Sequence, residues 1–218
     1  MTRIIAGSAG GRRLRVPPEG TRPTSDRVRE ALFNLLGARM DFDEARVLDL
    51  YAGSGALGLE ALSRGASRAL LVESDRKAAQ VIRGNIGDLG LDGAELRTNT
   101  VGAVLGRASV SAGVGRGRGA TDRAGGAAPE RAPSAAASPV GGPYDLVFSD
   151  PPYAVEVQEV LADLRALVAG GWLADGAIVV VERSTRSPEL DWPEQFAPEK
   201  SRTYGETRID LAEYAPRD

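Results

Sequence analysis

The chain has 218 residues, 42% of them hydrophobic, and a formal net charge of −3. That length allows one well-buried core with a small appendage, and the absence of cysteine and histidine excludes disulfides, thiolate zinc sites and Ser-His or Cys-His hydrolases. No run approaches the roughly 20 apolar residues of a membrane span, and the amino end lacks a signal-peptide pattern. We therefore expect a cytoplasmic protein that needs no metal.

The amino end is a basic arm on an acidic body. Segments 3–6 and 12–16 flank the glycine-rich run 7–11, which predicts a β-hairpin, and we assign residues 1–24 to this arm. The arginines of the arm and of the segment that follows are Arg3, Arg12, Arg13, Arg15, Arg22, Arg27 and Arg29. Such a cluster can contact nucleic-acid phosphates without sequence preference. The alternative is a solvated basic edge strand that prevents aggregation.

Residues 25–218 are predicted to form the main α/β domain. Ser25 is suited to cap a helix that ends at Gly37 and has one apolar stripe. The stripe consists of Val28, Ala31, Leu32, Leu35 and Leu36. Arg27 and Arg29 lie off its centre, so they are either solvated charges or part of the substrate entrance.

An apolar strand that contains Asp49 leads into a glycine loop and a helix. Gly53, Gly55 and Gly58 fit the G-x-G-x-x-G spacing, and Glu73 ends the next strand. This spacing also fits a dinucleotide site or a tight turn that binds nothing. A fixed carboxylate at Asp49 would repel a pyrophosphate but favour the ammonium and sulfonium groups of S-adenosylmethionine. In either site, Glu73 would accept hydrogen bonds from ribose hydroxyls.

The remaining segments alternate between helix and strand. Helices are expected at 75–89 and 157–168, strands at 95–99, 145–149 and 177–182, and a closing antiparallel pair at 198–214. This order predicts a doubly wound, mostly parallel sheet. Of the 37 residues from 107 to 143, 26 are Gly, Ala, Ser or Pro, which predicts a disordered insertion.

The strand after the insertion ends in Asp150, Pro151, Pro152 and Tyr153. The two prolines remove backbone donors and stiffen the chain, which leaves the Asp150 carboxylate and nearby carbonyls as acceptors beside the tyrosine ring. This ledge suits a flipped-out nucleobase whose exocyclic amine is held while its face is stacked. A surface turn stiffened by proline is the alternative. Because parallel strands end at one edge of a sheet, we expect the ledge to share a crevice with Asp49 and the glycine loop.

Four segments, 3–7, 22–34, 47–58 and 150–153, together resemble the bacterial RsmD family, which methylates a guanine N2 of small-subunit (16S) ribosomal RNA. The resemblance implies a class I S-adenosylmethionine-dependent methyltransferase fold. This fold is Rossmann-like, with a mostly parallel seven-stranded sheet, a closing antiparallel strand and, here, the small amino-terminal hairpin. It also implies S-adenosylmethionine as the donor and 16S rRNA in an assembling small subunit as the partner. A monomer is the default expectation.

The motifs give a predicted set of site residues. The donor-binding residues are Asp49, Ala52, Gly53, Ser54, Gly55, Gly58, Glu73 and Asn99. The family tends to place an acid where this chain has Asn99, whose amide oxygen can accept the same bond from adenine. The catalytic residues are Asp150, Pro151, Pro152 and Tyr153.

For the guanine substrate that the resemblance implies, we expect Asp150 and the Pro151 carbonyl to accept the two N–H bonds of the amine and to stabilise the positive charge that develops on nitrogen. Tyr153 stacks on the base, and no metal is needed. Other functions stay open: methylation of another exocyclic amine or amide (adenine N6 or protein glutamine), an NAD-dependent oxidoreductase, and a noncatalytic rRNA-binding factor.

Overall fold

The computed structural model describes residues 2–17, 25–107, 141–152 and 154–216. Arg22, Tyr153 and most of the predicted insertion, 108–140, lie outside these residues. Arg107, which begins the predicted insertion, lies inside them. Within the described ranges, no helix is long and apolar enough to cross a membrane.

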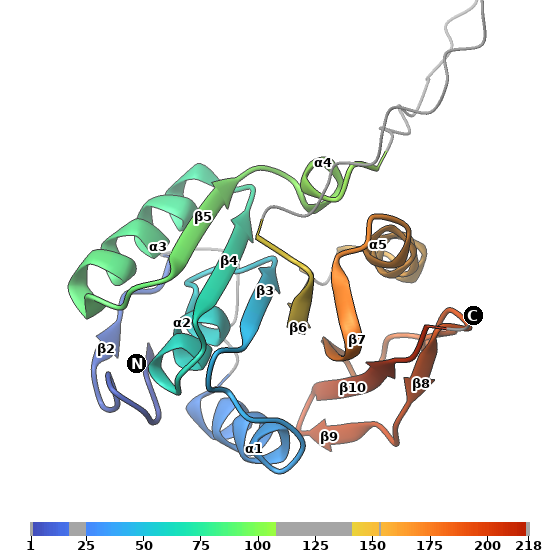
Figure 1. The fold of residues 1–218 in the computed structure, drawn as a ribbon, viewed down its shortest axis with the longest axis horizontal. Helices are drawn as coiled ribbons and strands as arrows, with labels where there is room; N and C mark the ends of the chain where they lie inside the picture. Colours follow the sequence, from blue (N-terminus) through green and yellow to red (C-terminus); the bar gives the residue numbers. More distant parts are fainter. Residues whose placement is uncertain (1, 18–24, 108–140, 153, 217–218) are drawn as a thin grey trace, which may run out of the picture.

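One mixed sheet forms the centre of the molecule (Figure 1). Its strands, in spatial order, are β5 Ala94–Thr98, β4 Arg68–Glu73, β3 Arg46–Leu50, β6 Tyr144–Ser149, β7 Leu173–Ser184, β10 Thr207–Tyr214 and β8 Phe196–Pro198, with β9 Arg202–Tyr204 also beside β10. The first five strands are parallel, and β10 is antiparallel to its neighbours. Because β8 and β9 pair with opposite ends of β10, the eight strands of this sheet fill seven positions in the described residues. The predicted sheet is confirmed.

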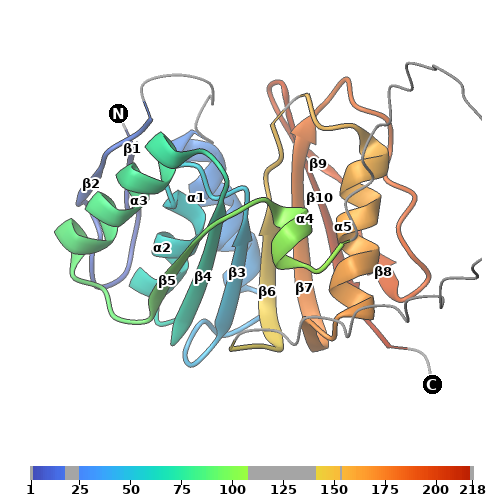
Figure 2. The same cartoon turned by 90° about the horizontal axis from the view of Figure 1, so that it is seen from above.

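Helices cover both faces of this sheet (Figures 1 and 2). Helices α1 Asp26–Gly37, α2 Ala56–Ser63 and α3 Arg76–Leu89 pack on one face, and α4 Val101–Val104 and α5 Val157–Ala169 pack on the other. Side chains alternate along β3, so Val47 joins the first core while Leu48 and Leu50 join the second. Burial on both faces explains the nearly continuous apolar runs in the parallel strands.

Local sequence accounts for the helix ends. Ser25 accepts the backbone N–H of Val28 at 3.3 Å and begins α1, and Asp75 accepts the N–H of Ala78 at 2.8 Å and begins α3. Gly90, with a φ of 62°, ends α3 in the left-handed conformation that glycine favours. Both predicted helices are confirmed.

The amino-terminal hairpin is packed into the domain. Strands β1 Thr2–Arg3 and β2 Arg13–Leu14 pair antiparallel, as predicted. Ile4 is fully buried in the core that α1 and α2 share. Glu60 of α2, also buried, accepts two consecutive backbone N–H groups of the hairpin at 2.7 and 3.1 Å. The hairpin therefore belongs to the core of the domain that it precedes.

Candidate functional site

A cavity of about 1430 Å³ lies beyond the carboxyl ends of β3, β4, β5 and β6. The predicted site residues that line it are Gly53, Glu73, Asn99, Asp150 and Pro152. Pro17, Tyr51 and Arg107, which were outside the predicted donor and catalytic set, line it as well. The fold thus brings the glycine loop, the acid after β4 and the Asp-Pro-Pro ledge around one cavity, as expected for the carboxyl edge of a parallel sheet.

The glycine loop needs glycine at two positions. Gly53 and Gly55 have φ values of 57° and 80°, which residues with a side chain rarely adopt. A Cβ on Gly55 would also lie 3.0 Å from a methyl group of Leu71. The other predicted loop residues, which with Gly55 are buried behind the cavity wall, are Ala52, Ser54 and Gly58. Gly53 is therefore the loop glycine that faces the cavity, and the others support it.

Asp49 does not line the cavity, contrary to its predicted role. It is 1% exposed, and its carboxylate accepts the N–H of Gly58 at 2.9 Å in the first turn of α2. Burial raises the pKa of Asp49 to about 7; the Gly58 N–H lowers it, and the charge of Glu73 raises it further. Because side chains alternate along β3, that of Asp49 points toward α2. Asp49 therefore supports the glycine loop through its hydrogen bond to Gly58, on the side away from the cavity.

The raised pKa of Asp49 predicts a pH-dependent stability. Because the folded-state pKa lies above that of an unfolded aspartate, its contribution to the free energy of unfolding is full below about pH 4 and is lost as pH rises through 7. The loss should reach about 1.4 kcal/mol per pH unit.

Asp49→Asn should lack this dependence. Urea unfolding of both proteins at a series of pH values tests the expectation. Equal slopes of the free energy of unfolding against pH in wild type and variant would contradict it. A shallower slope that remains in the variant would come from other buried carboxyl groups.

Glu73 holds the loop while facing the cavity. Its carboxylate accepts the N–H of Gly53 at 2.9 Å and that of Asp75 at 2.7 Å, so it fixes both the glycine loop and the start of α3. Its remaining lone pairs can accept hydrogen bonds from ligand hydroxyls. Asn99 is exposed, and its side-chain oxygen accepts the N–H of Thr100 at 2.9 Å. The oxygen predicted to meet adenine is thus already hydrogen-bonded within its own turn.

Asp150 follows β6 and forms part of the cavity wall. It is half-buried, and its backbone N–H donates to the carbonyl of Leu50 at 3.5 Å, which ties the ledge to β3. Pro151 is buried and does not line the cavity, whereas Pro152 is exposed and does. The Pro152 carbonyl accepts the N–H of Val155 at 2.8 Å, so the ledge turns directly toward α5.

Tyr51, Arg107 and Asp163 form a network beside the cavity that was not predicted. Tyr51, with a φ of 62°, donates its hydroxyl to Asp163 at 2.7 Å, and Arg107 donates to the same carboxylate at 2.5 Å. Burial raises the pKa of Asp163 to about 6, against the opposing effects of Tyr51 and Arg107. The sequence feature that could have predicted this network is the position of Asp163 on the apolar face of α5, between Val160 and Leu167.

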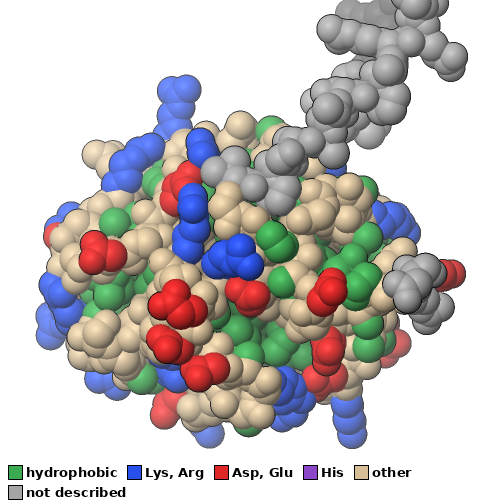
Figure 3. Space-filling view, in the orientation of Figure 1, with side chains coloured by type: hydrophobic (Ala, Val, Ile, Leu, Met, Phe, Trp, Pro, Cys, Tyr) green, Lys and Arg blue, Asp and Glu red, His purple; other side chains and the backbone are tan. Residues whose placement is uncertain are grey.

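The exposed arginines of the predicted RNA-binding set have two kinds of position. Arg12 donates to the carbonyls of Asp88 and, at 2.6 Å, Leu89 at the end of α3, and Arg15 pairs with Asp88 at 2.7 Å. These two therefore also anchor the hairpin. Arg3, Arg13 and Arg27 are exposed as well. On the face of the molecule in Figure 3, basic and acidic side chains are interspersed.

Arg29 is a wrong prediction within the RNA-binding set. Its side chain is 0% exposed and donates to the carbonyl of Arg3 and, at 2.9 Å, to Asp26. Its Nε lies 3.9 Å from the carboxylate of Glu60, and burial lowers its pKa. The hairpin covers this flank of α1, so a position that looks solvated on an isolated helix is enclosed.

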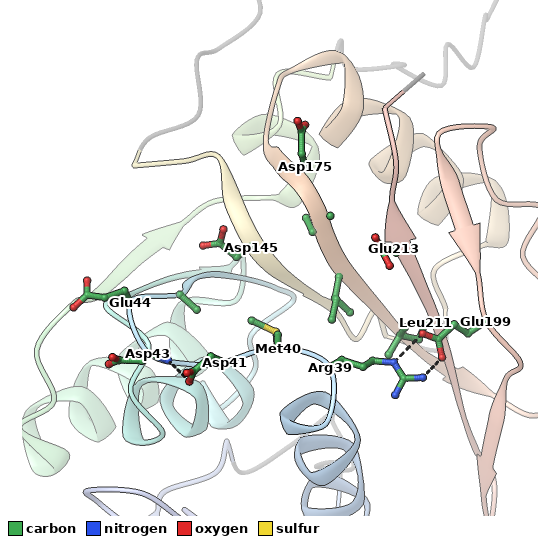
Figure 4. Close-up of a pocket in the computed structure, with 14 residues that line it drawn as sticks. Arg39, Met40, Asp41, Asp43, Glu44, Asp145, Asp175, Glu199, Leu211 and Glu213 are labelled. Atoms are coloured by element: carbon green, nitrogen blue, oxygen red, sulfur yellow. Dashed lines mark hydrogen bonds and ion pairs between the residues drawn. The ribbon is translucent and has the colours of Figure 1, made fainter. Parts of the chain in front are cut away.

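A second cavity, of about 570 Å³, lies at the opposite edge of the sheet, beside the amino ends of β3 and β6 (Figure 4). Its walls are acidic, and Figure 4 shows Arg39 paired with Glu199 there. In the part of the chain that the structure describes, no group of three or more His, Cys, Asp or Glu side chains could hold a metal ion. None of the predicted site residues lines this cavity.

The chain is similar to known proteins over nearly its whole length. Ribosomal RNA small subunit methyltransferase D of Escherichia coli K12 is 34% identical over 210 residues, which cover 96% of this chain and 88% of that protein. The solved structure of the Escherichia coli protein yhhF is similar, with a TM-score of 0.73 and 32% identity over 99% of both chains. A hypothetical protein of Thermus thermophilus has a TM-score of 0.70 and 29% identity, covering 97% of this chain and 98% of that one.

A family model described as Conserved hypothetical protein 95 matches residues 2–113 and 129–213. The match covers most of the chain, including the residues on both sides of the predicted insertion that line the cavity. It includes the glycine loop, the acid after β4 and the ledge after β6. The resemblance to the RsmD family is confirmed, and the chain belongs to the Conserved hypothetical protein 95 family.

Proposed function

We propose that this protein transfers a methyl group from S-adenosylmethionine to the N2 amine of a guanine in 16S ribosomal RNA. The observation that carries the proposal is the meeting of Gly53, Glu73 and Asp150 on one cavity at the carboxyl edge of the sheet. The name of the Escherichia coli relative, a small-subunit ribosomal RNA methyltransferase, supports the RNA substrate. We further propose that the protein acts in the cytoplasm, as a monomer, on an assembling small subunit.

The cavity suits a positively charged donor. Glu73 and Asp150 both line it, and two carboxylates favour the ammonium and sulfonium charges of S-adenosylmethionine over a pyrophosphate. Asp49 is buried away from the cavity and does not contribute to this preference through direct contact with the donor. Gly53 allows a close approach of backbone to ligand, and Glu73 offers acceptors for ribose hydroxyls. When bound, the donor supplies an electrophilic methyl group.

The chain's own residues prepare the amine. Asp150, at the wall between β6 and α5, would accept an N–H of the guanine amine and stabilise positive charge on nitrogen as the N–CH3 bond forms and the methyl–sulfur bond breaks, which leaves S-adenosylhomocysteine. The same carboxylate would then accept the proton that the methylated amine must lose. Pro152 leaves its side of the ledge without an N–H donor that could compete. Stacking by Tyr153 stays a prediction, because that residue lies outside the described ones.

The direct experiment supplies methyl-labelled donor, unmodified small subunits and naked 16S rRNA, followed by nucleoside analysis. We expect labelled N2-methylguanosine. Labelled N6-methyladenosine, or label on protein glutamine, would contradict the base assignment while keeping the donor. Calorimetry with S-adenosylmethionine and NAD separates the oxidoreductase alternative, which requires NAD to bind.

Arg13 should contribute to RNA affinity through a phosphate contact. Arg13→Ala is expected to weaken RNA binding and to reduce the slope of log affinity against log salt by roughly 0.7 to 0.9. Arg46→Ala is the matched control, since Arg46 begins β3 at the edge of the sheet opposite the cavity. Salt titrations of RNA binding test both variants. An unchanged slope in Arg13→Ala would remove this arginine from the interface.

A further inference from the structure

Asn85 of α3 is a buried polar side chain whose hydrogen-bonding groups all have partners. It is 1% exposed. Its side-chain oxygen accepts the N–H of Arg15 at 2.9 Å, and its amide donates to the carbonyl of Arg15 at 3.0 Å and to that of Ser54 at 2.9 Å. The Asn85 side chain thus bonds both the N–H and the carbonyl of Arg15, as the backbone of a neighbouring strand would. It also donates a hydrogen bond to the carbonyl of Ser54. Buried networks with every member satisfied restrict a structure to one arrangement.

The two partners of Asn85 belong to different parts of the predicted machinery. Ser54 lies in the glycine loop, between Gly53 and Gly55. Arg15 lies just after β2, and the same stretch of chain continues to Pro17, which lines the donor cavity. The hairpin is therefore connected to the donor loop through one side chain, and it also contributes to the cavity wall.

We propose that Asn85 is a positioning residue that couples the hairpin to the glycine loop, so that RNA held by the hairpin and donor held by the cavity each strengthen the binding of the other. The inference rests on the proposed function for the identity of both ligands. Any displacement of the hairpin would be passed to the carbonyl of Ser54, since Asn85 cannot keep both partners unless they hold their relative positions. Coupling of this kind is reciprocal in binding free energy.

The hairpin is attached at its other end by a glycine that has no room for a side chain. Gly7 has a φ of 83°, and a Cβ there would lie 1.7 Å from the carbonyl oxygen of Ser63 in α2. Gly11, in the same hairpin, has a φ of 82°, but a Cβ there would meet nothing within 4 Å. Alanine at either position carries the same backbone strain, and only Gly7→Ala pushes the hairpin away from α2.

The first test changes the bridge itself. Asn85→Asp keeps the shape of the side chain but replaces the amide nitrogen, which donates both N–H groups, by an oxygen that can only accept and that faces the carbonyls of Arg15 and Ser54. We expect roughly tenfold weaker donor binding, measured by calorimetry without RNA, in a variant whose thermal unfolding still shows a folded protein. In wild type, unmodified 16S rRNA should tighten donor binding, and in Asn85→Asp this enhancement should be lost.

The second test moves the hairpin without touching Asn85. Gly7→Ala should weaken donor binding and reduce the enhancement by RNA, while Gly11→Ala should keep the wild-type donor affinity. Wild-type donor affinity in folded Asn85→Asp and Gly7→Ala would overturn the coupling. Failure of the wild type to bind S-adenosylmethionine would instead overturn the proposed function together with this inference, so the two failures are distinguishable.

Discussion

Asp150→Ala should slow methyl transfer by about a hundred- to a thousandfold, the usual effect of removing one preorganised hydrogen-bonding group from a transition state. The reason is the place of Asp150 on the cavity wall between β6 and α5, where its carboxylate can meet the amine of a base. Donor affinity should fall by far less than the transfer rate, because Glu73 and the glycine loop remain and only one of the two cavity carboxylates is lost. The loss should therefore be seen in the rate constant for transfer.

Single-turnover transfer at saturating donor measures that rate constant, and calorimetry measures donor affinity separately. Asp145→Ala is the matched control, since Asp145 lies at the other end of the same strand and lines the second, acidic cavity (Figure 4). We expect near-normal transfer from it. A near-normal rate in Asp150→Ala would remove Asp150 from the chemistry and leave the ledge as a binding surface.

The sheet and the cavity wall could be predicted because they depend on local patterns. Apolar runs of strand length, glycines with positive φ and acids at strand ends each have a meaning that hardly depends on the rest of the chain. The strands that end at Glu73 and Ser149 are found where the sequence predicts them. Since parallel strands share a carboxyl edge, the meeting of Gly53, Glu73 and Asp150 followed from the topology alone.

Predictions failed or were missing where a side chain's direction depends on packing between distant segments. Asp49 lies near the carboxyl end of β3, where the sequence predicts the crevice. The alternation of side chains along β3 nevertheless turns its carboxylate toward α2. Arg29 looks solvated on an isolated helix, and only the hairpin encloses it. The bonds of Asn85 join positions 70 and 31 residues away along the chain, which no local pattern reports. These contacts decide which charges are available to a ligand.

The hairpin also contributes to the stability of the folded domain through its contacts with Glu60. This buried carboxylate accepts N–H groups from Ile5 and Ala6 and the Nε–H of Arg64 at 2.8 Å, and it lies near buried Arg29. It is thus the point where the hairpin, α1 and α2 meet. Deleting the hairpin would remove two hydrogen-bond donors from this buried carboxylate and would expose the core residues that the hairpin covers. A loss of RNA binding on deletion could therefore reflect unfolding.

Glu60→Leu should lower the free energy of unfolding by about 3 to 5 kcal/mol, the usual cost of removing one partner of a buried ion pair. Urea unfolding measures the loss, and Glu30→Leu, at an exposed position of α1, is the matched control. A loss below about 1 kcal/mol would mean that the cluster relaxes by admitting water. The double variant Arg29→Met with Glu60→Leu should recover part of the loss, because it removes the buried Arg29 charge that Glu60→Leu leaves beside an apolar side chain. The hairpin N–H groups would still lack their acceptor, so recovery should stay incomplete.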